Sequence, residues 1–277
     1  MRIDSHQHFW QLSRGDYSWL TAELGLIYRD FAADDLRPFL QRHKIDATII
    51  VQAAPTISET EFMLDIARRT DFVKGVVGWA DLQAKDAPEK IGRLSTRDHL
   101  VGLRPMIQDI PDPEWMLKPA LEPAIAEMER SHLRFDALLK PPHLEPFKQF
   151  LRNYPNLPIV IDHGAKPEIR KDGFAAWAPA MREIARDERV FCKLSGLATE
   201  AKSDWQTGDL KSYIDHLVAS FGPARLMWGS DWPVVNLAGG YDRWMEASVA
   251  CLTALSGDEQ AAIFGGTAAR FYGVPVS

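Results

Sequence analysis

The 277-residue sequence contains only two cysteines, Cys192 and Cys251, so it cannot form the disulfide framework that stabilises small secreted domains. Its first residues lack the apolar segment of a signal peptide, and no run approaches the roughly 18 apolar residues of a membrane helix. We therefore expect a protein of the reducing cytoplasm that has no membrane partner.

An excess of positive charge is also missing, because 32 lysines and arginines stand against 38 acidic residues and the net charge is −6. This balance argues against a nucleic acid as the main partner. The hydrophobic content of 46% and the charged content of 25% are average for a globular protein, which excludes the disordered, collagen-like and coiled-coil classes. No low-complexity linker divides the chain, so we expect one domain over residues 1–277.

Short apolar or β-branched runs recur along the whole length of the chain. They lack the polar–apolar alternation of half-exposed strands, as expected for a parallel sheet that is buried on both faces. Successive runs begin about 32 residues apart, which leaves room for one strand and one crossover helix. The predicted strands are residues 3–9, 47–53, 75–82, 100–107, 135–140, 157–163, 190–197 and 226–231.

The segments between these runs have helical character. Ser58 and Glu61 match a capping box, and residues 113–130, 173–187, 209–221 and 241–255 predict further helices. Eight strands that alternate with helices predict a single-domain (β/α)8 barrel of the TIM type. The alternative, an open doubly wound sheet, is disfavoured because no glycine-rich phosphate turn follows the first run.

Polar residues stand where several predicted strands end, which is where barrel enzymes place their reactive groups. His6 and His8 close the first run and, two residues apart on a strand, point to the same side. His163 closes the sixth run and Asp231 the eighth. Each alone could be a hydrogen-bonded core residue or a helix cap. Because all four lie at strand ends, and a charge there is unfavourable unless it is paired or functional, we interpret them as a functional set.

This pattern resembles the amidohydrolase superfamily, in which an Asp-x-His-x-His motif on the first strand is joined by a later histidine and a final aspartate. The resemblance extends over the whole chain and is narrower to the sugar-lactonase branch, which includes L-fuconolactone and L-rhamnonolactone hydrolases and pyrone-dicarboxylate lactonase. It implies a distorted (β/α)8 barrel that opens a lactone with water. The matching segments are residues 4–10, 17–20, 229–233 and 263–272.

The fourth strand departs from the binuclear members of the superfamily, which carry a carbamylated lysine there. This chain has Arg104, and a guanidinium cannot bridge two metal ions. The resemblance therefore implies at most one divalent ion, zinc or manganese, held by His6, His8 and Asp231 and dispensable for some lactonases. No organic cofactor is implied.

The resemblance also implies roles for these residues. Asp231 would act as the general base that activates water, and Arg104 with the strand-one histidines would stabilise the oxyanion. His163 would orient the carbonyl or assist the departing ring oxygen. A metal-dependent decarboxylase of the same superfamily is the alternative, and a non-catalytic binding or scaffold barrel is a third hypothesis. The complete set of histidines and aspartate argues against the third.

Aromatic residues and cations near the strand ends bear on the substrate. Trp19, Trp79 and Trp232 could stack on a sugar ring, although a tryptophan taken alone more often fills a core. Besides Arg104, the sequence places Lys140 at the barrel mouth. Lys193 lies inside the seventh run, where a lysine is more often paired within the barrel, although it could also reach a sugar hydroxyl. A dicarboxylate would need several cations. We therefore expect a small neutral sugar lactone as the partner of this site, and no motif specifies an oligomeric state.

Overall fold

Eight parallel strands form the centre of the computed structural model, which describes residues 1–275. Each strand pairs with the next in chain order, and the segment after the last strand returns to the first through the pairing of Gln7 with Trp232. The sheet thereby nearly closes, which confirms the predicted (β/α)8 barrel. The strands are β1 (Ile3–Gln7), β2 (Ala47–Val51), β3 (Val73–Gly78), β4 (Leu100–Leu103), β5 (Arg134–Ala137), β6 (Ile159–Ile161), β7 (Val190–Leu194) and β8 (Leu226–Trp228).

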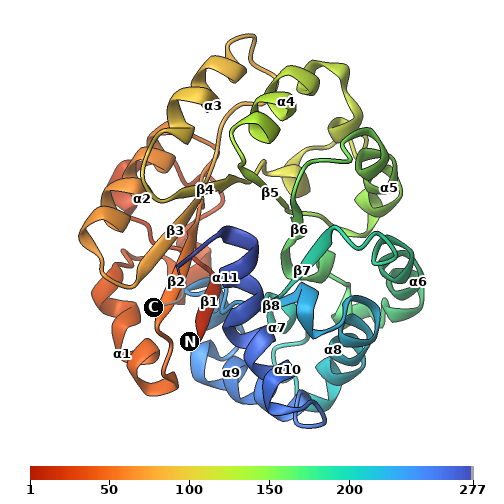
Figure 1. Cartoon of the computed structure of the whole chain (residues 1–277). Helices are drawn as coiled ribbons and strands as arrows, with labels where there is room; N and C mark the ends of the chain where they lie inside the picture. The colour runs from red at the N-terminus through yellow and green to blue at the C-terminus, as the bar shows by residue number, and fades with distance from the viewer. Residues whose placement is uncertain (276–277) are drawn as a thin grey trace.

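The helices surround this sheet (Figure 1). Among residues 1–275, none combines the length and apolar character that a membrane span requires. The α-helices are α1 (Ala33–His43), α2 (Ile57–Arg69), α3 (Ala87–Ser95), α4 (Glu122–Arg130), α5 (Leu144–Asn153), α6 (Phe174–Ile184), α7 (Leu197–Glu200), α8 (Thr207–Phe221), α9 (Gly240–Cys251), α10 (Gly257–Ala261) and α11 (Thr267–Tyr272).

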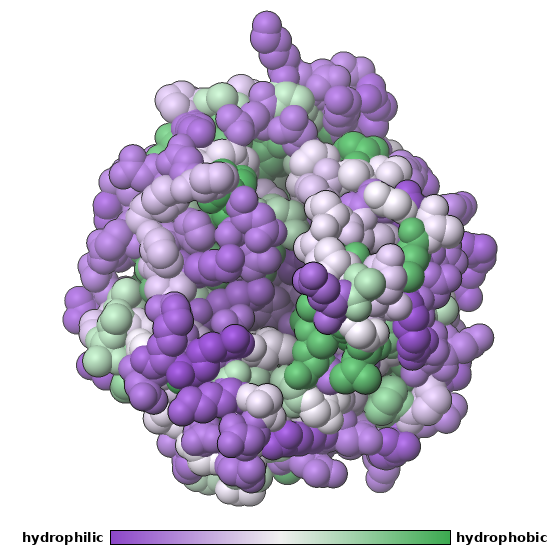
Figure 2. All heavy atoms as spheres, turned by 180° about the vertical axis from the view of Figure 1, so that it is seen from behind, coloured by the Kyte–Doolittle hydropathy of each residue, from purple (hydrophilic) through white to green (hydrophobic). Residues whose placement is uncertain are grey.

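The two ends of the barrel differ. α11 lies across the N-terminal ends of the strands, where Phe271 and Tyr272 pack with Ile3 and Met227 in an apolar cluster. The opposite end, where the strands terminate, is hollowed, and hydrophilic residues gather in the hollow (Figure 2). One end is therefore closed by the chain itself and the other is accessible to a ligand.

Several predicted strands extend past the observed ones at this open end. The predicted strand over residues 157–163 ends at Ile161, and that over residues 226–231 ends at Trp228. The residues that follow, Asp162 and His163 after one strand and 229–231 after the other, stay buried although the extended backbone has stopped. The backbones of His163 and Asp231 are left-handed instead, with φ of 55° and 57°.

Two helices also begin at residues other than those predicted from the sequence. The N-cap of α2 is Thr56, whose hydroxyl accepts the Glu59 N–H at 3.0 Å, and the capping box predicted at Ser58 is therefore wrong. The helix expected over residues 113–130 begins only at Glu122, after two 3₁₀ turns. Prolines in this stretch lack the N–H that a continuous helix would need, and Pro123 stands where a helix tolerates it, in the first turn.

Candidate active site

The four residues singled out at the strand ends lie together at the open end of the barrel. Asp231 is at the centre, and its Oδ1 lies 3.2 Å from Nε2 of His8, 3.8 Å from Nε2 of His6 and 4.0 Å from Nε2 of His163. At most 6% of any of the four side chains is exposed. A carboxylate and three imidazoles therefore meet in a space that is shielded from solvent.

Local backbone geometry brings two of these side chains into place. The Asp231 N–H donates to the His6 carbonyl at 2.8 Å, which ties the segment after β8 to β1. His163 is packed so closely against Gly196 that a Cβ at that glycine would lie 2.5 Å from Nδ1 of the histidine. Ser195 then meets the same Nδ1 at 2.9 Å and fixes the orientation of the ring.

The ionisation of the cluster follows from its burial. Burial lowers the pKa of His8 and lowers that of His163 to about 3, so both rings are neutral near pH 7. Burial alone would raise the pKa of Asp231, but the neighbouring His163 favours the charged form and brings the pKa well below its usual value. The carboxylate is therefore ionised near pH 7.

Arg104, directly after β4, adds a positive charge to the cluster. Its guanidinium lies 3.3 Å from Nε2 of His6 and 3.3 Å from the Asp162 carboxylate, and it also donates to the carbonyl of Gln52. Its Nε finds no acceptor among residues 1–275 and is buried. Asp162 and Gln52 were not among the predicted site residues, although a carboxylate directly after a buried apolar strand was visible in the sequence.

Lys193 on β7 lies beneath the cluster, inside the barrel. The side chain is completely buried, and its Nζ contacts Asp136 at 2.5 Å, Asp162 at 3.0 Å and Nδ1 of His6 at 3.1 Å. Tyr272 from α11 donates to the same Asp136 carboxylate at 2.7 Å. Lys193 is therefore a paired lysine inside the barrel, as is more common for such a residue, and it does not reach the barrel mouth.

A cavity of about 180 Å³ opens above the cluster. This volume is below the roughly 300–1,000 Å³ of pockets for drug-sized ligands, so it suits a small molecule. Trp19 contributes an aromatic wall. The other lining residues are His8, Ala53, Arg104, Met106, Gln108, Asp109, Leu138, His163, Lys166, Asp231 and Val234.

The remaining predicted substrate contacts lie outside this lining. Trp232 is 1% exposed and packs against Phe9 and Phe31 in the core. Trp79 lines a neighbouring cavity, and Lys140 reaches the rim, where its Nζ donates to the carbonyl of Gln108 at 3.1 Å. Lys166 lines the cavity and was missed, because nothing in the local sequence indicates the direction of its side chain.

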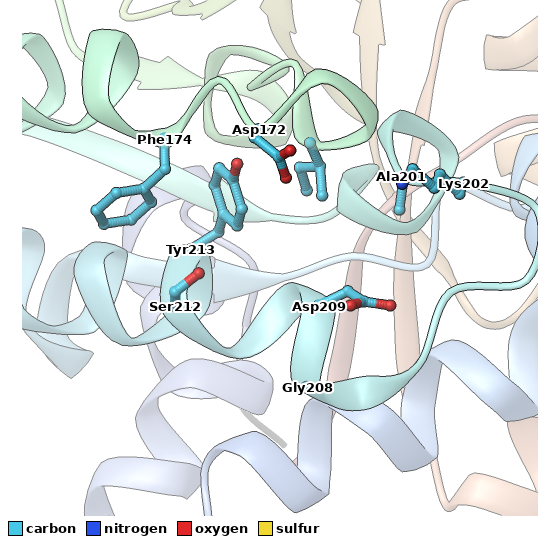
Figure 3. Close-up of a pocket in the computed structure, with 9 residues that line it drawn as sticks. Asp172, Phe174, Ala201, Lys202, Gly208, Asp209, Ser212 and Tyr213 are labelled. Atoms are coloured by element: carbon cyan, nitrogen blue, oxygen red, sulfur yellow. The ribbon is translucent and has the colours of Figure 1, made fainter.

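A second cavity, of about 290 Å³, lies in the outer layer between the segment before α6 and the start of α8 (Figure 3). Asp172, Asp209 and Tyr213 face it, together with apolar side chains and Lys202. None of the strand-end histidines or Arg104 lines it. The smaller cavity inside the barrel mouth is therefore the candidate active site.

The cluster fits one metal ion. One ligand atom each from His6, His163 and Asp231 lie within 4.8 Å of one another. Nδ1 of His8 donates to the Val51 carbonyl at 2.7 Å, so the neutral ring turns the lone pair of Nε2 toward the Asp231 carboxylate. Two acceptors then face each other, which favours a cation between them, and nitrogen with carboxylate ligands suits zinc or manganese.

Residues 3–274 match the family model described as Amidohydrolase. The chain belongs to the amidohydrolase family. This confirms the resemblance that the strand-end residues indicated in the sequence.

Close relatives of this amidohydrolase have lactonase names. It is 46% identical to an L-fucono-1,5-lactonase of Burkholderia ambifaria over 98% of its own length and 95% of the relative. An L-fucono-1,5-lactonase of Burkholderia multivorans is 36% identical over 99% of this chain and 97% of the relative. A crystal structure of an amidohydrolase from Burkholderia multivorans with bound zinc superposes with a TM-score of 0.94 at 35% identity, covering 99% of this chain and 100% of that one.

Proposed function

We propose that this amidohydrolase hydrolyses a small neutral sugar lactone, of the L-fuconolactone type, to the sugar acid. The observation that carries the proposal is the buried Asp231 carboxylate, which lines the same small cavity as the buried Arg104. A carboxylate base and a fixed cation are the two groups that attack of water on an ester carbonyl requires. The names of the lactonase relatives support the same substrate class.

The roles of the residues follow from their atoms. Asp231 accepts a proton from water, and the oxygen of that water attacks the lactone carbonyl. Arg104 lines the cavity with its charge fixed by Asp162 and Gln52, so it stabilises the oxyanion without reorganising. His8 and His163, neutral and held by Val51 and Ser195, position the carbonyl over the carboxylate.

A single divalent ion, zinc or manganese, would be held by His6, His163 and Asp231, with His8 beside them. When bound, it would supply Lewis-acid polarisation of the carbonyl and a more acidic water. We propose that it is dispensable, because Asp231 and Arg104 already provide a base and a positive charge.

We expect no more than one equivalent of tightly bound metal per chain. A bridging carbamylated lysine would be needed between two ions, and the position after β4 is occupied by Arg104, whose guanidinium repels a second cation. Protein saturated with zinc, freed of excess ion and measured by elemental analysis should give a ratio at or below one. A ratio of two would contradict the mononuclear site.

We expect kcat/KM for L-fucono-1,5-lactone to exceed that for 2-pyrone-4,6-dicarboxylate by at least about 100-fold, because unmatched like charges cost several kcal/mol. Asp109 and Asp231 line the cavity, Arg104 is already paired with Asp162, and Lys166 alone cannot match the two carboxylates of the pyrone. Both substrates should be assayed side by side with the same enzyme. If the dicarboxylate were opened faster than every neutral lactone tried, the proposed substrate class would be wrong.

The function itself is tested by screening aldonolactones with a pH indicator, with and without a chelator, since opening a lactone releases a proton. Proton release from a neutral lactone, with no loss of carbon, supports the proposal. Hydroxybenzoate acids assayed in parallel for carbon dioxide test the decarboxylase alternative. Carbon dioxide release without any lactone opening would favour that alternative.

A further inference from the structure

An unusual turn follows β6 and carries two residues of the cavity. His163, Gly164, Ala165 and Lys166 have consecutive left-handed backbones, with φ of 55°, 55°, 60° and 48°. This conformation costs roughly 1–2 kcal/mol for each residue other than glycine, and such strain concentrates at functional sites. With about three residues per turn, side chains three apart point the same way. His163 and Lys166 accordingly both line the cavity, while Gly164 and Ala165 do not.

The ammonium group of Lys166 has no hydrogen-bond or ion-pair partner among residues 1–275. In contrast, two aspartates hold the ammonium group of Lys193, and the Gln108 carbonyl accepts a hydrogen bond from that of Lys140. Burial lowers the pKa of Lys166, and the negative charges of Asp231 and Glu200 partly oppose that effect. A partly buried cation that faces the cavity with no structural partner is available to the substrate.

We propose that Lys166 contacts the ring oxygen of the lactone and donates a proton to it as the ring opens. The inference rests on the proposed function and adds a catalytic residue to it. The other lining groups are less suited to this step. Arg104 does not release protons in proteins, and His163, which lacks a proton to spare as a neutral ring, faces Asp231 and Ser195.

The step balances as follows. Water adds to the carbonyl carbon and leaves one proton on Asp231. The bond between the carbonyl carbon and the ring oxygen then breaks, and its electron pair goes to the ring oxygen, which takes a proton from Nζ of Lys166. The new carboxylic acid ionises. Return of one proton to Lys166 and release of the proton on Asp231 leave a carboxylate and one free proton for each lactone and water consumed.

The experiment compares two leaving groups. The substrates are L-fucono-1,5-lactone and the thiolactone in which sulfur replaces its ring oxygen. A thiol of pKa about 8.5 departs as a thiolate without help, whereas an alkoxide needs a proton. In the variant Lys166→Met, kcat for the oxygen lactone should fall at least about 100-fold, and kcat for the thiolactone less than about threefold. Turnover of the thiolactone also shows that the variant is folded.

Lys171→Met is the matched control, because Lys171 is an exposed lysine five residues away whose only ion pair within residues 1–275 is with Glu168. It should leave both rates unchanged. Equal losses on both lactones in Lys166→Met would show that Lys166 only positions the substrate, and unchanged rates would show that it takes no part; either result overturns its role as proton donor. A wild-type enzyme that opens neither lactone would instead overturn the proposed function, and the inference with it.

Discussion

Replacing the central carboxylate by its amide, Asp231→Asn, is expected to lower kcat for lactone opening at least about 100-fold while the protein stays folded. The amide nitrogen and oxygen retain the shape of the side chain, but the group cannot accept a proton from water. Asp231 has three imidazoles within 4.0 Å of Oδ1, and no second unpaired carboxylate is found at their centre among residues 1–275. Among residues 1–275, Asp231 is therefore the carboxylate placed to accept the proton at that point.

The control for this variant is Asp215→Asn on α8. Asp215 is exposed and, in the part of the chain that the structure describes, is paired only with Lys211; surface ion pairs contribute little to stability. Steady-state kinetics of both variants, with circular dichroism to verify the fold, separate loss of the base from loss of structure. An Asp231→Asn enzyme with near-normal kcat would remove Asp231 from the mechanism.

The largest effect on stability is expected inside the barrel. Lys193→Met should lower the free energy of unfolding by about 3–5 kcal/mol, because it removes the cation from two fully buried carboxylates, Asp136 and Asp162. Methionine fills a similar volume, so the loss comes from the uncompensated charge and not from a cavity. Urea denaturation of the variant and the parent protein measures the difference.

Two further variants test whether the loss of the buried positive charge causes the lower stability. Lys211→Met removes an exposed lysine and should change the free energy of unfolding by less than about 1 kcal/mol. Adding Asp136→Asn to Lys193→Met removes one of the orphaned charges and should recover part of the lost stability. A single variant Lys193→Met as stable as the parent would show that Asp136 and Asp162 do not depend on this lysine.

The barrel could be predicted because its signal is local. β2 and β6 are buried along their whole length, so each appears in the sequence as an uninterrupted apolar run between turn-forming residues. The ends of the strands could not be read in the same way. After β6 and β8 the chain stays buried while the backbones of His163 and Asp231 are left-handed, and residue type alone does not show where the extended geometry stops.

The prediction of substrate contacts depended on residue type alone, which does not reveal direction. Trp19 and Trp232 have the same chemistry and both lie near a strand end. Trp19 borders the cavity and donates its Nε1–H to the Ala53 carbonyl at 2.7 Å, whereas Trp232 packs into the core. Packing against neighbours from distant parts of the chain decides between these two outcomes.

The sequence by itself determined the barrel, the family and the set of histidines and aspartate at the strand ends, because strand periodicity and the rule for parallel barrels depend only on residue order. Only the tertiary structure decided which cations face the cavity. Lys193 is drawn inside by Asp136 and Asp162, and Lys166 is turned into the cavity by four left-handed residues. The physical reason is that the direction of a side chain after a strand follows from a few backbone angles, and long-range packing stabilises those angles against their local preference.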